Sequence, residues 1–317
     1  MTPSSEPPVA AVDIGTNSVK LTVARIEPSG LNVLFDTTKT TRLGKNVDAA
    51  GRLDPDAVQR TLDALAEYAR VARDQHGAVR IAAVGTSALR DAANGPEFIA
   101  RAGEILNNVV EIISGDREAR LIHTAAARDP DLALPPRAPL VVMDIGGGST
   151  EVVLGEGERI TFRDSLQLGA VRLTERALPS DPPTKNELVR ATQIADDALA
   201  AVPVPSAFAT LVGSGGTIAN IAALERATPV SGDPAARAAL HGLRLSRAQI
   251  EARIAFLAAL TTRERRTLPG LEPDRADVIV AGALIQARAL ARLDASEVVV
   301  SLRGLRYGLL YELAEEI

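Results

Sequence analysis

Apolar residues along this chain fall into two patterns: short continuous runs, and longer stretches in which they recur every three or four positions. The runs predict buried β-strands, and the three-to-four spacing predicts amphipathic helices. Strands are predicted over Val9–Ile14, Ser18–Ile26, Val79–Val84, Leu140–Ile145, Thr150–Leu154, Arg159–Arg163, Ala207–Val212 and Glu297–Ser301. Helices are predicted over Asp54–Gln75, Gly95–Leu106, Glu118–Ala127, Lys185–Ala201 and Ser246–Thr261. Because the two kinds of element alternate, an α/β fold is expected.

One short motif occurs twice and indicates the domain organisation. Asp13–Ser18 (DIGTNS) and Asp144–Ser149 (DIGGGS) both fit D-I-G-x-x-S, and each follows an apolar strand. A repeat at this long spacing indicates two similarly built domains rather than a solenoid. The stretch 129–139, rich in Pro, Asp and Arg, is the best linker candidate. We expect domains at 1–125 and 126–317, with a last helix over about 304–317 that packs back across the domain junction.

The chemistry of a strand that ends in D-x-G follows from its backbone. Glycine lets the chain approach a ligand closely, and consecutive N–H groups in such a turn form a concavity that binds anions. The aspartate carries the same sign of charge as phosphate, so it is suited to holding a cation or orienting water. A tight structural hairpin explains a single copy equally well, but two matched copies favour a pair of phosphate-binding turns.

A third glycine cluster, Val212–Ile218 (VGSGGTI), follows an apolar strand and leads into a helical stretch. A strand–glycine–helix junction can present N–H groups to a phosphate or accommodate a nucleotide base. A helix that starts beside a crowded sheet also needs glycine, so this cluster alone does not separate binding from packing.

Composition removes several classes of function. The chain has 317 residues and no Cys, which excludes disulfides, zinc–thiolate sites, iron–sulfur clusters and thiol catalysis. Its formal charge of −5 and pI near 5.4 argue against a nucleic-acid partner but allow a local basic cleft for a polyanion. No apolar run reaches the roughly 18 residues that span a bilayer, and residues 1–8 lack a signal-peptide pattern. A cytoplasmic protein with no membrane partner is expected.

Six motifs extend over nearly the whole chain: Asp13–Leu21 (DIGTNSVKL), Thr86–Asn94 (TSALRDAAN), Ser114–Ile122 (SGDREARLI), Asp144–Glu151 (DIGGGSTE), Gly213–Thr217 (GSGGT) and Ser301–Leu309 (SLRGLRYGL). Their kind and their order resemble those of the exopolyphosphatase / guanosine pentaphosphatase (Ppx/GppA) family, within the actin-like ATPase-domain superfamily. Six motifs in one order make the resemblance far more specific than a single turn.

The resemblance implies a fold and an activity. The fold is two actin-like ATPase (ribonuclease H-like) domains, each built on a mixed sheet with helices, flanking an interdomain cleft. The activity is hydrolysis of a terminal phosphoanhydride with Mg²⁺ or another divalent cation. The catalytic base of the S-G-x-x-E-A motif corresponds to Glu118, and the metal ligands correspond to Asp144 and Glu151. Without the resemblance, Glu118 is better explained by the helix dipole at a helix N-terminus.

The same correspondence assigns further residues to the substrate phosphates. The forked guanidinium of Arg90 suits bidentate phosphate binding; a surface Arg paired with Asp91 or Glu97 is the alternative. The complete set of expected phosphate-binding residues is Asp13, Gly15, Thr16, Asn17, Ser18, Arg90, Gly146, Gly147, Gly148, Ser149, Gly213, Gly215, Gly216 and Thr217.

Other charged and polar positions leave alternatives open. Arg42, Lys45 and Arg52 match the family's R-L-G segment and line either a path for a long polyanion or a solvated loop. The C-terminal motif departs from the family pattern, because Tyr307 stands where an acidic residue is usual. The histidines have no ligand spacing and are expected at the surface or in the core: His76, His123 and His241.

The leading hypothesis is an exopolyphosphatase that releases orthophosphate from inorganic polyphosphate. A pppGpp 5′-phosphohydrolase is the alternative, because both substrates present the same triphosphate-like end. A sugar or acid kinase of the superfamily would need a pocket motif that is missing here. A non-catalytic sensor of guanosine tetra- or pentaphosphate needs none of Glu118, Asp144 and Glu151, although Tyr307 favours it. A homodimer is compatible with the family.

Overall fold

The computed structural model describes residues 6–28, 30–135, 137–205, 209–230 and 234–316. The chain divides into two compact units, Met1–Leu121 with Leu305–Ile317, and Ile122–Gly304. The division falls inside a helix, upstream of the stretch 129–139 where we expected the linker, and the C-terminal helix belongs to the first unit. Each unit has its own sheet and its own hydrophobic core.

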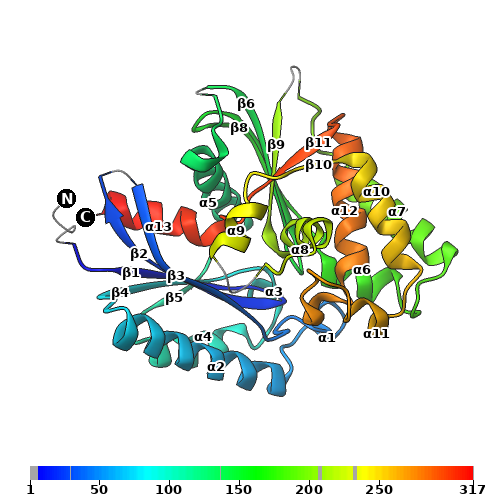
Figure 1. Cartoon of the computed structure of the whole chain (residues 1–317). Coiled ribbons are helices and arrows are strands. Elements are labelled where there is room, and N and C mark those ends of the chain that lie inside the picture. Colours follow the sequence, from blue (N-terminus) through cyan, green and yellow to red (C-terminus); the bar gives the residue numbers. More distant parts are fainter. Residues whose placement is uncertain (1–5, 29, 136, 206–208, 231–233, 317) are drawn as a thin grey trace. The chain divides into compact units, whose positions relative to one another are not determined.

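The sheet of the first unit has five strands in the order β3-β2-β1-β4-β5 (Figure 1). Strand β1 pairs antiparallel with β2 and parallel with β4, so the first D-I-G turn closes the β1–β2 hairpin. All of β1 is buried, as expected for a central strand covered on both faces. The strands are β1 (Val9–Ile14), β2 (Ser18–Glu27), β3 (Gly30–Thr40), β4 (Arg80–Gly85) and β5 (Val110–Ile112).

Helices cover both faces of this sheet, with α2 and α4 on one face and α13 on the other (Figure 1). Helix α2 begins as its sequence predicts, because Asp54 accepts the Ala57 N–H over 2.9 Å and Pro55 occupies the first turn. The helices are α1 (Val47–Ala50), α2 (Pro55–Arg70, continued by a π turn over Val71–Gln75), α3 (Ser87–Asp91), α4 (Gly95–Leu106), α5 (Gly115–Ala127) and α13 (Leu305–Glu315).

The second unit repeats this topology. Its six-stranded sheet has the order β10-β11-β9-β6-β7-β8, and β6 is antiparallel to β7 and parallel to β9, as β1 is to β2 and β4. The strands are β6 (Pro139–Ile145), β7 (Thr150–Glu156), β8 (Arg159–Leu166), β9 (Thr210–Ser214), β10 (Arg244–Ser246) and β11 (Glu297–Val300). The prediction of an α/β chain with two similarly built domains is confirmed. The predicted start of the strand at Ala207 lies outside the described residues.

The helices of the second unit gather around α12, which packs against α6, α7, α8 and α10 (Figure 1). Because its neighbours bury α12 almost completely, its sequence lacks the one-sided apolar stripe of a surface helix and did not predict it. The helices are α6 (Ala170–Ala177), α7 (Lys185–Leu199), α8 (Gly215–Arg226), α9 (Pro234–Leu240), α10 (Arg247–Ala258), α11 (Thr262–Arg265) and α12 (Ile279–Arg292).

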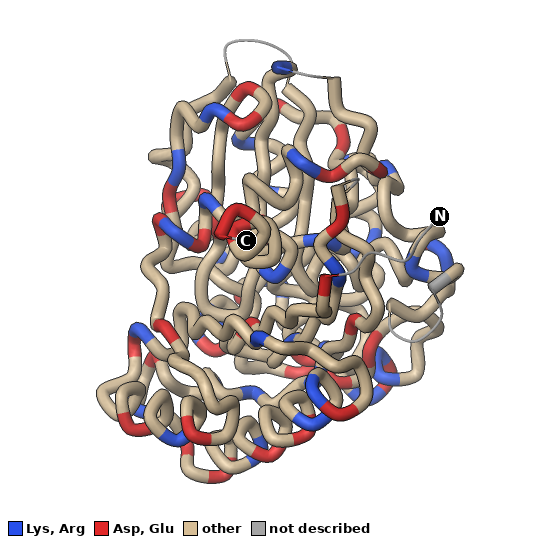
Figure 2. The backbone as a smooth tube through the Cα atoms, turned by 90° about the vertical axis from the view of Figure 1, so that its left-hand side faces the viewer, with Lys and Arg blue, Asp and Glu red and all other residues tan. Residues whose placement is uncertain are grey.

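Acidic and basic residues are interspersed along the chain, as Figure 2 shows, in keeping with the small net charge. Because positive and negative side chains are mixed, their long-range electrostatic potentials largely cancel. Electrostatic effects are therefore expected from local clusters of charged residues. Within the described ranges, no helix is long and apolar enough to cross a membrane.

Candidate active site

The first glycine turn joins β1 to β2. The Gly15 N–H donates to Ser18 O over 3.1 Å, and a Cβ on Gly15 would lie only 3.0 Å from the same oxygen. Thr16 and Asn17 at the tip of the turn are buried, and the Gly44 N–H donates to Thr16 O over 2.8 Å. The turn is therefore covered by a segment that follows β3.

That segment is the R-L-G stretch. The amides of Thr41 and Arg42 both donate to Asn17 O, over 3.1 and 2.9 Å. Arg42 adopts a φ of 57°, a left-handed conformation that costs energy in a residue other than glycine. The backbone of the stretch therefore holds the first turn, while the side chains of Lys45 and Arg52 are exposed.

The aspartate of the first turn has a basic partner. Asp13 in β1 lies directly opposite Lys20 in β2, and Lys20 Nζ lies 2.8 Å from Asp13 Oδ2. The Asp13 side chain is 5% exposed, so the lysine neutralises an almost buried carboxylate. The sequence contains both residues within one motif, but only the strand register shows that they pair.

The second turn, between β6 and β7, has the same internal bond, from the Gly146 N–H to Ser149 O over 3.0 Å. The amides at the start of α6 donate to the carbonyl oxygens of Gly146 and Gly147, each over 2.9 Å. The side chain of Arg172 donates to Gly148 O over 2.7 Å. The carbonyl groups of the turn are thus held by protein donors, an arrangement that leaves its amide side for an anion.

The aspartate of the second turn faces another carboxylate. Asp144 in β6 lies directly opposite Glu151 in β7. The Ser214 hydroxyl donates to Asp144 Oδ2 over 2.8 Å, and the Ser165 hydroxyl donates to Glu151 Oε1 over 2.7 Å. Glu151 is 1% exposed. Like charges placed directly opposite on neighbouring strands repel each other, so this pair gains from a cation between them.

The backbone around Asp144 tests whether the pair fits a metal ion. Gly215 has a φ of +91°, and a Cβ there would lie 3.2 Å from Asp144 Cγ. A Cβ on Gly304 would lie 3.2 Å from Asp144 Oδ2. Two glycines thus make a tight cradle for one carboxylate beside a second, buried one. Oxygen ligands of this kind are the ones that Mg²⁺ prefers, so the residues present fit a divalent cation.

The third glycine cluster has contacts with protein groups at each of its members. A Cβ on Gly213 would lie 2.9 Å from a methyl group of Val298, and the guanidinium of Arg275 lies where a Cβ of Gly216 would be. Thr217 is buried. These contacts agree with the packing alternative for the cluster, and Gly215 places it beside Asp144.

Glu118 lies in the first turn of α5, where its N–H donates to Ser114 O over 3.0 Å. Arg90, at the end of α3, donates from Nη1 to Glu118 Oε2 and to Ile113 O, each over 2.9 Å. The structure therefore brings the expected base and an expected substrate ligand into direct contact. Sequence reasoning missed this ion pair, because α3 and α5 meet only in the folded unit.

Two side-chain donors of the first unit are buried. Among the residues that the structure describes, neither Asn17 Nδ2 nor Arg90 Nη2 has a hydrogen-bond partner. A buried donor without an acceptor costs free energy, so such groups in a native protein indicate a ligand or water that completes them. Both atoms are donors, and both belong to residues expected to bind phosphate.

A second acidic cluster, which the sequence did not reveal, lies in the second unit. Asp129 and Asp131 come together with His241, whose Nε2 lies 3.2 Å from Asp129 Oδ2. Arg303 forms ion pairs with both carboxylates. His241 Nδ1 accepts the Leu302 N–H, so the neutral ring carries its proton on Nε2 and cannot bind a metal there. The arginine and the ring tautomer both argue against a metal at this cluster.

The other histidines have packing roles. The His76 ring lies 5.0 Å from the Phe35 ring. His123 is buried against β7, where a Cβ on Gly155 would lie 2.8 Å from His123 Nε2. Burial lowers the pKa of His123, because an apolar environment disfavours the charged imidazolium.

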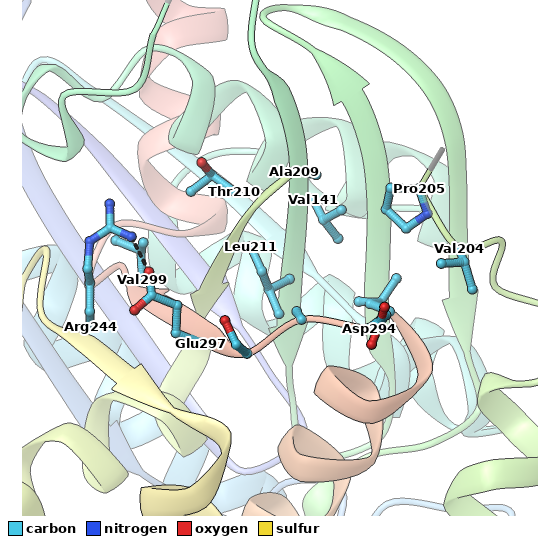
Figure 3. A pocket seen from close by; sticks show the side chains of 13 residues that line it. Val141, Val204, Pro205, Ala209, Thr210, Leu211, Arg244, Asp294, Glu297 and Val299 are labelled. Atoms are coloured by element: carbon cyan, nitrogen blue, oxygen red, sulfur yellow. Dashed lines mark hydrogen bonds and ion pairs between the residues drawn. The ribbon is translucent and has the colours of Figure 1, made fainter. Parts of the chain in front are cut away.

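A cavity of about 260 Å³ lies at the amino-terminal ends of β6, β9 and β11 (Figure 3). Val141, Leu211 and Val299 contribute apolar lining, and Arg244 pairs with Glu297 over 2.5 Å. The D-I-G turn and the third glycine cluster follow the opposite, carboxyl-terminal ends of these strands. Ligands of open α/β sheets bind at that opposite edge, so the cavity is separate from the candidate site.

Comparisons with known proteins agree on one family. The model of the Ppx/GppA phosphatase family matches residues 22–317. Exopolyphosphatase 2 of Mycobacterium tuberculosis is 38% identical over 290 residues, 87% of this chain and 88% of that protein. Guanosine-5′-triphosphate,3′-diphosphate pyrophosphatase of Vibrio cholerae is 30% identical over 99% of this chain and 60% of that protein. The crystal structure of the Aquifex aeolicus Ppx/GppA family member is 36% identical, with a TM-score of 0.80 and 98% of each chain covered.

Proposed function

Because the chain belongs to the Ppx/GppA phosphatase family, we propose that this phosphatase is an exopolyphosphatase that releases orthophosphate from the end of inorganic polyphosphate. The observation that carries the proposal is the facing pair of Asp144 and Glu151, a built site for a divalent cation directly beside a phosphate-sized glycine turn. Phosphatases of this family depend on a divalent cation, and Mg²⁺ suits an all-oxygen site of this kind.

The residues of the second unit would bind the metal ion and one phosphate. Asp144 and Glu151 would hold Mg²⁺, which supplies neutralisation of the phosphate oxygens and of the leaving group. The N–H groups of Gly147, Gly148 and Ser149 would hold one phosphate, because the carbonyl groups of the three glycines are already bound by α6 and Arg172. The Gly146 N–H is used inside the turn, where it donates to Ser149 O. Gly215 of the third cluster would act indirectly, through the position of Asp144.

The residues of the first unit bind a second phosphate and move the proton. The amides of Thr16, Asn17 and Ser18, with the buried Asn17 Nδ2, are suited to an anionic oxygen. Arg90 would keep Glu118 in place with Nη1 and offer Nη2 to the substrate. These groups position reactants rather than react covalently, as phosphoryl transfer requires.

The bond changes of the proposed reaction are simple. A water oxygen forms a bond to the terminal phosphorus while the bond from that phosphorus to the bridging oxygen breaks. Glu118 takes a proton from the attacking water. The shortened chain is the leaving group, and the former bridging oxygen becomes its terminal oxygen. The products are orthophosphate and a polyphosphate shorter by one unit.

The guanosine pentaphosphate alternative has support from the Vibrio cholerae relative, whose match covers 99% of this chain and 60% of the relative. The two substrates share a terminal anhydride, so the groups described above would act on either. A sensor without catalysis is disfavoured, because Glu118, Asp144 and Glu151 are all present and are positioned by specific contacts.

Release of orthophosphate tests the proposal. Wild type and Glu118→Gln are compared on medium- and long-chain polyphosphate, pppGpp and ATP, with Mg²⁺ and with a chelator. We expect fastest release from polyphosphate, loss of activity without the cation, and a decrease of roughly 10²–10⁴-fold in the variant, the share of a general base. Faster release of orthophosphate from pppGpp would replace polyphosphate as the proposed substrate. Tight alarmone binding without any release of orthophosphate would contradict the proposed enzymatic activity.

A further inference from the structure

The C-terminal helix α13 packs within the first unit against two elements that carry residues of the candidate site. These elements are the β1–β2 hairpin, which carries Asp13 and Lys20, and α5, which carries Glu118. Because both contacts lie in the first turns of α13, one short segment connects the two groups.

The contact with the hairpin is a buried polar network. Arg306 Nη1 donates to Leu21 O over 2.8 Å and to Asp36 Oδ1 over 3.1 Å, and the Tyr307 hydroxyl donates to Asp36 Oδ2 over 3.1 Å. Burial lowers the pKa of Arg306, but the nearby carboxylates of Asp36 and Asp13 outweigh burial and raise it above its usual value. Asp36 in β3 thus supplies a carboxylate beside Tyr307.

The contact with α5 is made by backbone. A Cβ on Gly308 would lie 2.6 Å from the carbonyl carbon of Leu121, so the two helices touch without a side chain between them. One turn further along, Glu312 pairs with Arg117 over 2.9 Å. Arg117 immediately precedes Glu118, so both contacts bear on the turn that carries the proposed base.

We infer that α13 is a positioning element of the active site, with Gly308 and Tyr307 as its positioning residues for Glu118 and for the Asp13 strand. The inference rests on the proposed function through the role of Glu118. A fixed spacing matters because a displacement of about 1 Å in a catalytic group can lower a rate roughly 10²-fold. A Cβ on Gly308 would force a displacement of about that size, since ordinary carbon contacts begin near 3.5 Å.

Gly308→Ala tests the inference, with Leu62→Ala as the matched control. Leu62 is a buried residue of α2 in the same unit, and its truncation leaves a cavity without a new contact on α5. We expect Gly308→Ala to lower kcat on polyphosphate by about 10²-fold with KM changed less than about threefold, and Leu62→Ala to leave both within about threefold at a temperature below its Tm. Equal kcat values for the two variants would overturn the inference.

Amide hydrogen exchange supplies an arm that needs no substrate. In Gly308→Ala the amides of residues 115–121 should exchange faster than in wild type and in Leu62→Ala, and unchanged exchange would overturn the α13–α5 contact. Inactivity of the wild type on every substrate would overturn the proposed function. The exchange measurement would still decide whether α13 positions α5.

Glu312→Gln is a milder variant that keeps the fold, because Glu312 is 39% exposed. It removes one of the two carboxylates that pair with Arg117, the other being Glu111, and should lower kcat about threefold, the effect expected for a surface ion pair. No change in kcat together with unchanged exchange over 115–121 would count against positioning.

Discussion

The two D-I-G turns have the same backbone and opposite electrostatics. Each closes a hairpin with a bond from the first glycine amide to the serine carbonyl, and each places an aspartate opposite one residue of the next strand. In the first unit that residue is Lys20, which neutralises Asp13. In the second unit it is Glu151, which adds a second negative charge beside Asp144.

This difference shows how a repeated scaffold takes on separate tasks. The first turn has a cation from the protein beside its carboxylate. In the proposed function the second turn would take a cation from solution, because like charges opposite each other in a sheet repel. The proposal therefore predicts that the side chain at one position decides which unit binds a metal ion.

The largest expected effect comes from making the second turn resemble the first. In Glu151→Lys, the new ammonium group lies opposite Asp144 and takes the place of the metal ion. We expect activity to fall roughly 10³-fold or more, since neutralisation of the developing charge is lost, and Mg²⁺ to stop raising Tm. Orthophosphate release and thermal unfolding with and without Mg²⁺ measure both. A variant that remains Mg²⁺-dependent and active would break the comparison.

The reverse change should have a smaller and more specific effect. In Lys20→Glu the first turn acquires two facing carboxylates, so it should lose about 2 kcal/mol of stability in a chelator through an uncompensated, nearly buried charge. Mg²⁺ should restore part of this, raising Tm by a few degrees through linkage. Lys20→Met is the control, because it removes the cation without adding a ligand. Equal responses of the two variants to Mg²⁺ would contradict the interpretation.

The smallest expected effect concerns the far end of the two hairpins. Gly155 in β7 occupies the place that Ala24 occupies in β2, and His123 packs against it. Burial lowers the pKa of His123, so the unfolded chain binds a proton more readily than the folded one. The stability that neutral His123 contributes is therefore fully present above the usual pKa of histidine. It is lost as the pH falls through the lowered pKa of His123 in the folded protein.

Calorimetry from about pH 8 to about pH 5 should show this as a difference between wild type and His123→Leu. The Tm of wild type should fall further, because only wild type carries the imidazole whose protonation opposes folding. Parallel curves for the two proteins would mean that the imidazole does not couple folding to protonation.

The sequence predicted those elements whose signals are local. Strand β1 and helix α4 have the predicted bounds, Val9–Ile14 and Gly95–Leu106, because a buried apolar run and a Pro-led helix start are visible in the residues themselves. Helix α5 begins three residues before its predicted start, at Gly115. Helix α12 was missed, since burial on all sides removes the amphipathic pattern.

The candidate site shows the same limit. The motifs identified the two turns and Glu118, but the partners of these groups depend on strand register and helix packing. The bonds from Arg90 to Glu118 and from Ser214 to Asp144 join residues far apart in the sequence. Such long-range pairs cannot be predicted from the periodicity or the spacing of residues in the sequence. The roles of the site residues in the reaction remain predictions for the experiments above.

The assignment of Leu305–Ile317 to the first unit has a consequence for biosynthesis. A ribosome completes every residue of the second unit before it adds the helix that covers one face of the first sheet. A nascent chain that ends at Gly304 therefore has a whole second unit, while the first still exposes the apolar face of β1 and β2 and lacks Arg306 and Tyr307, which donate to Asp36. The unit that begins synthesis first is thus the last to be finished.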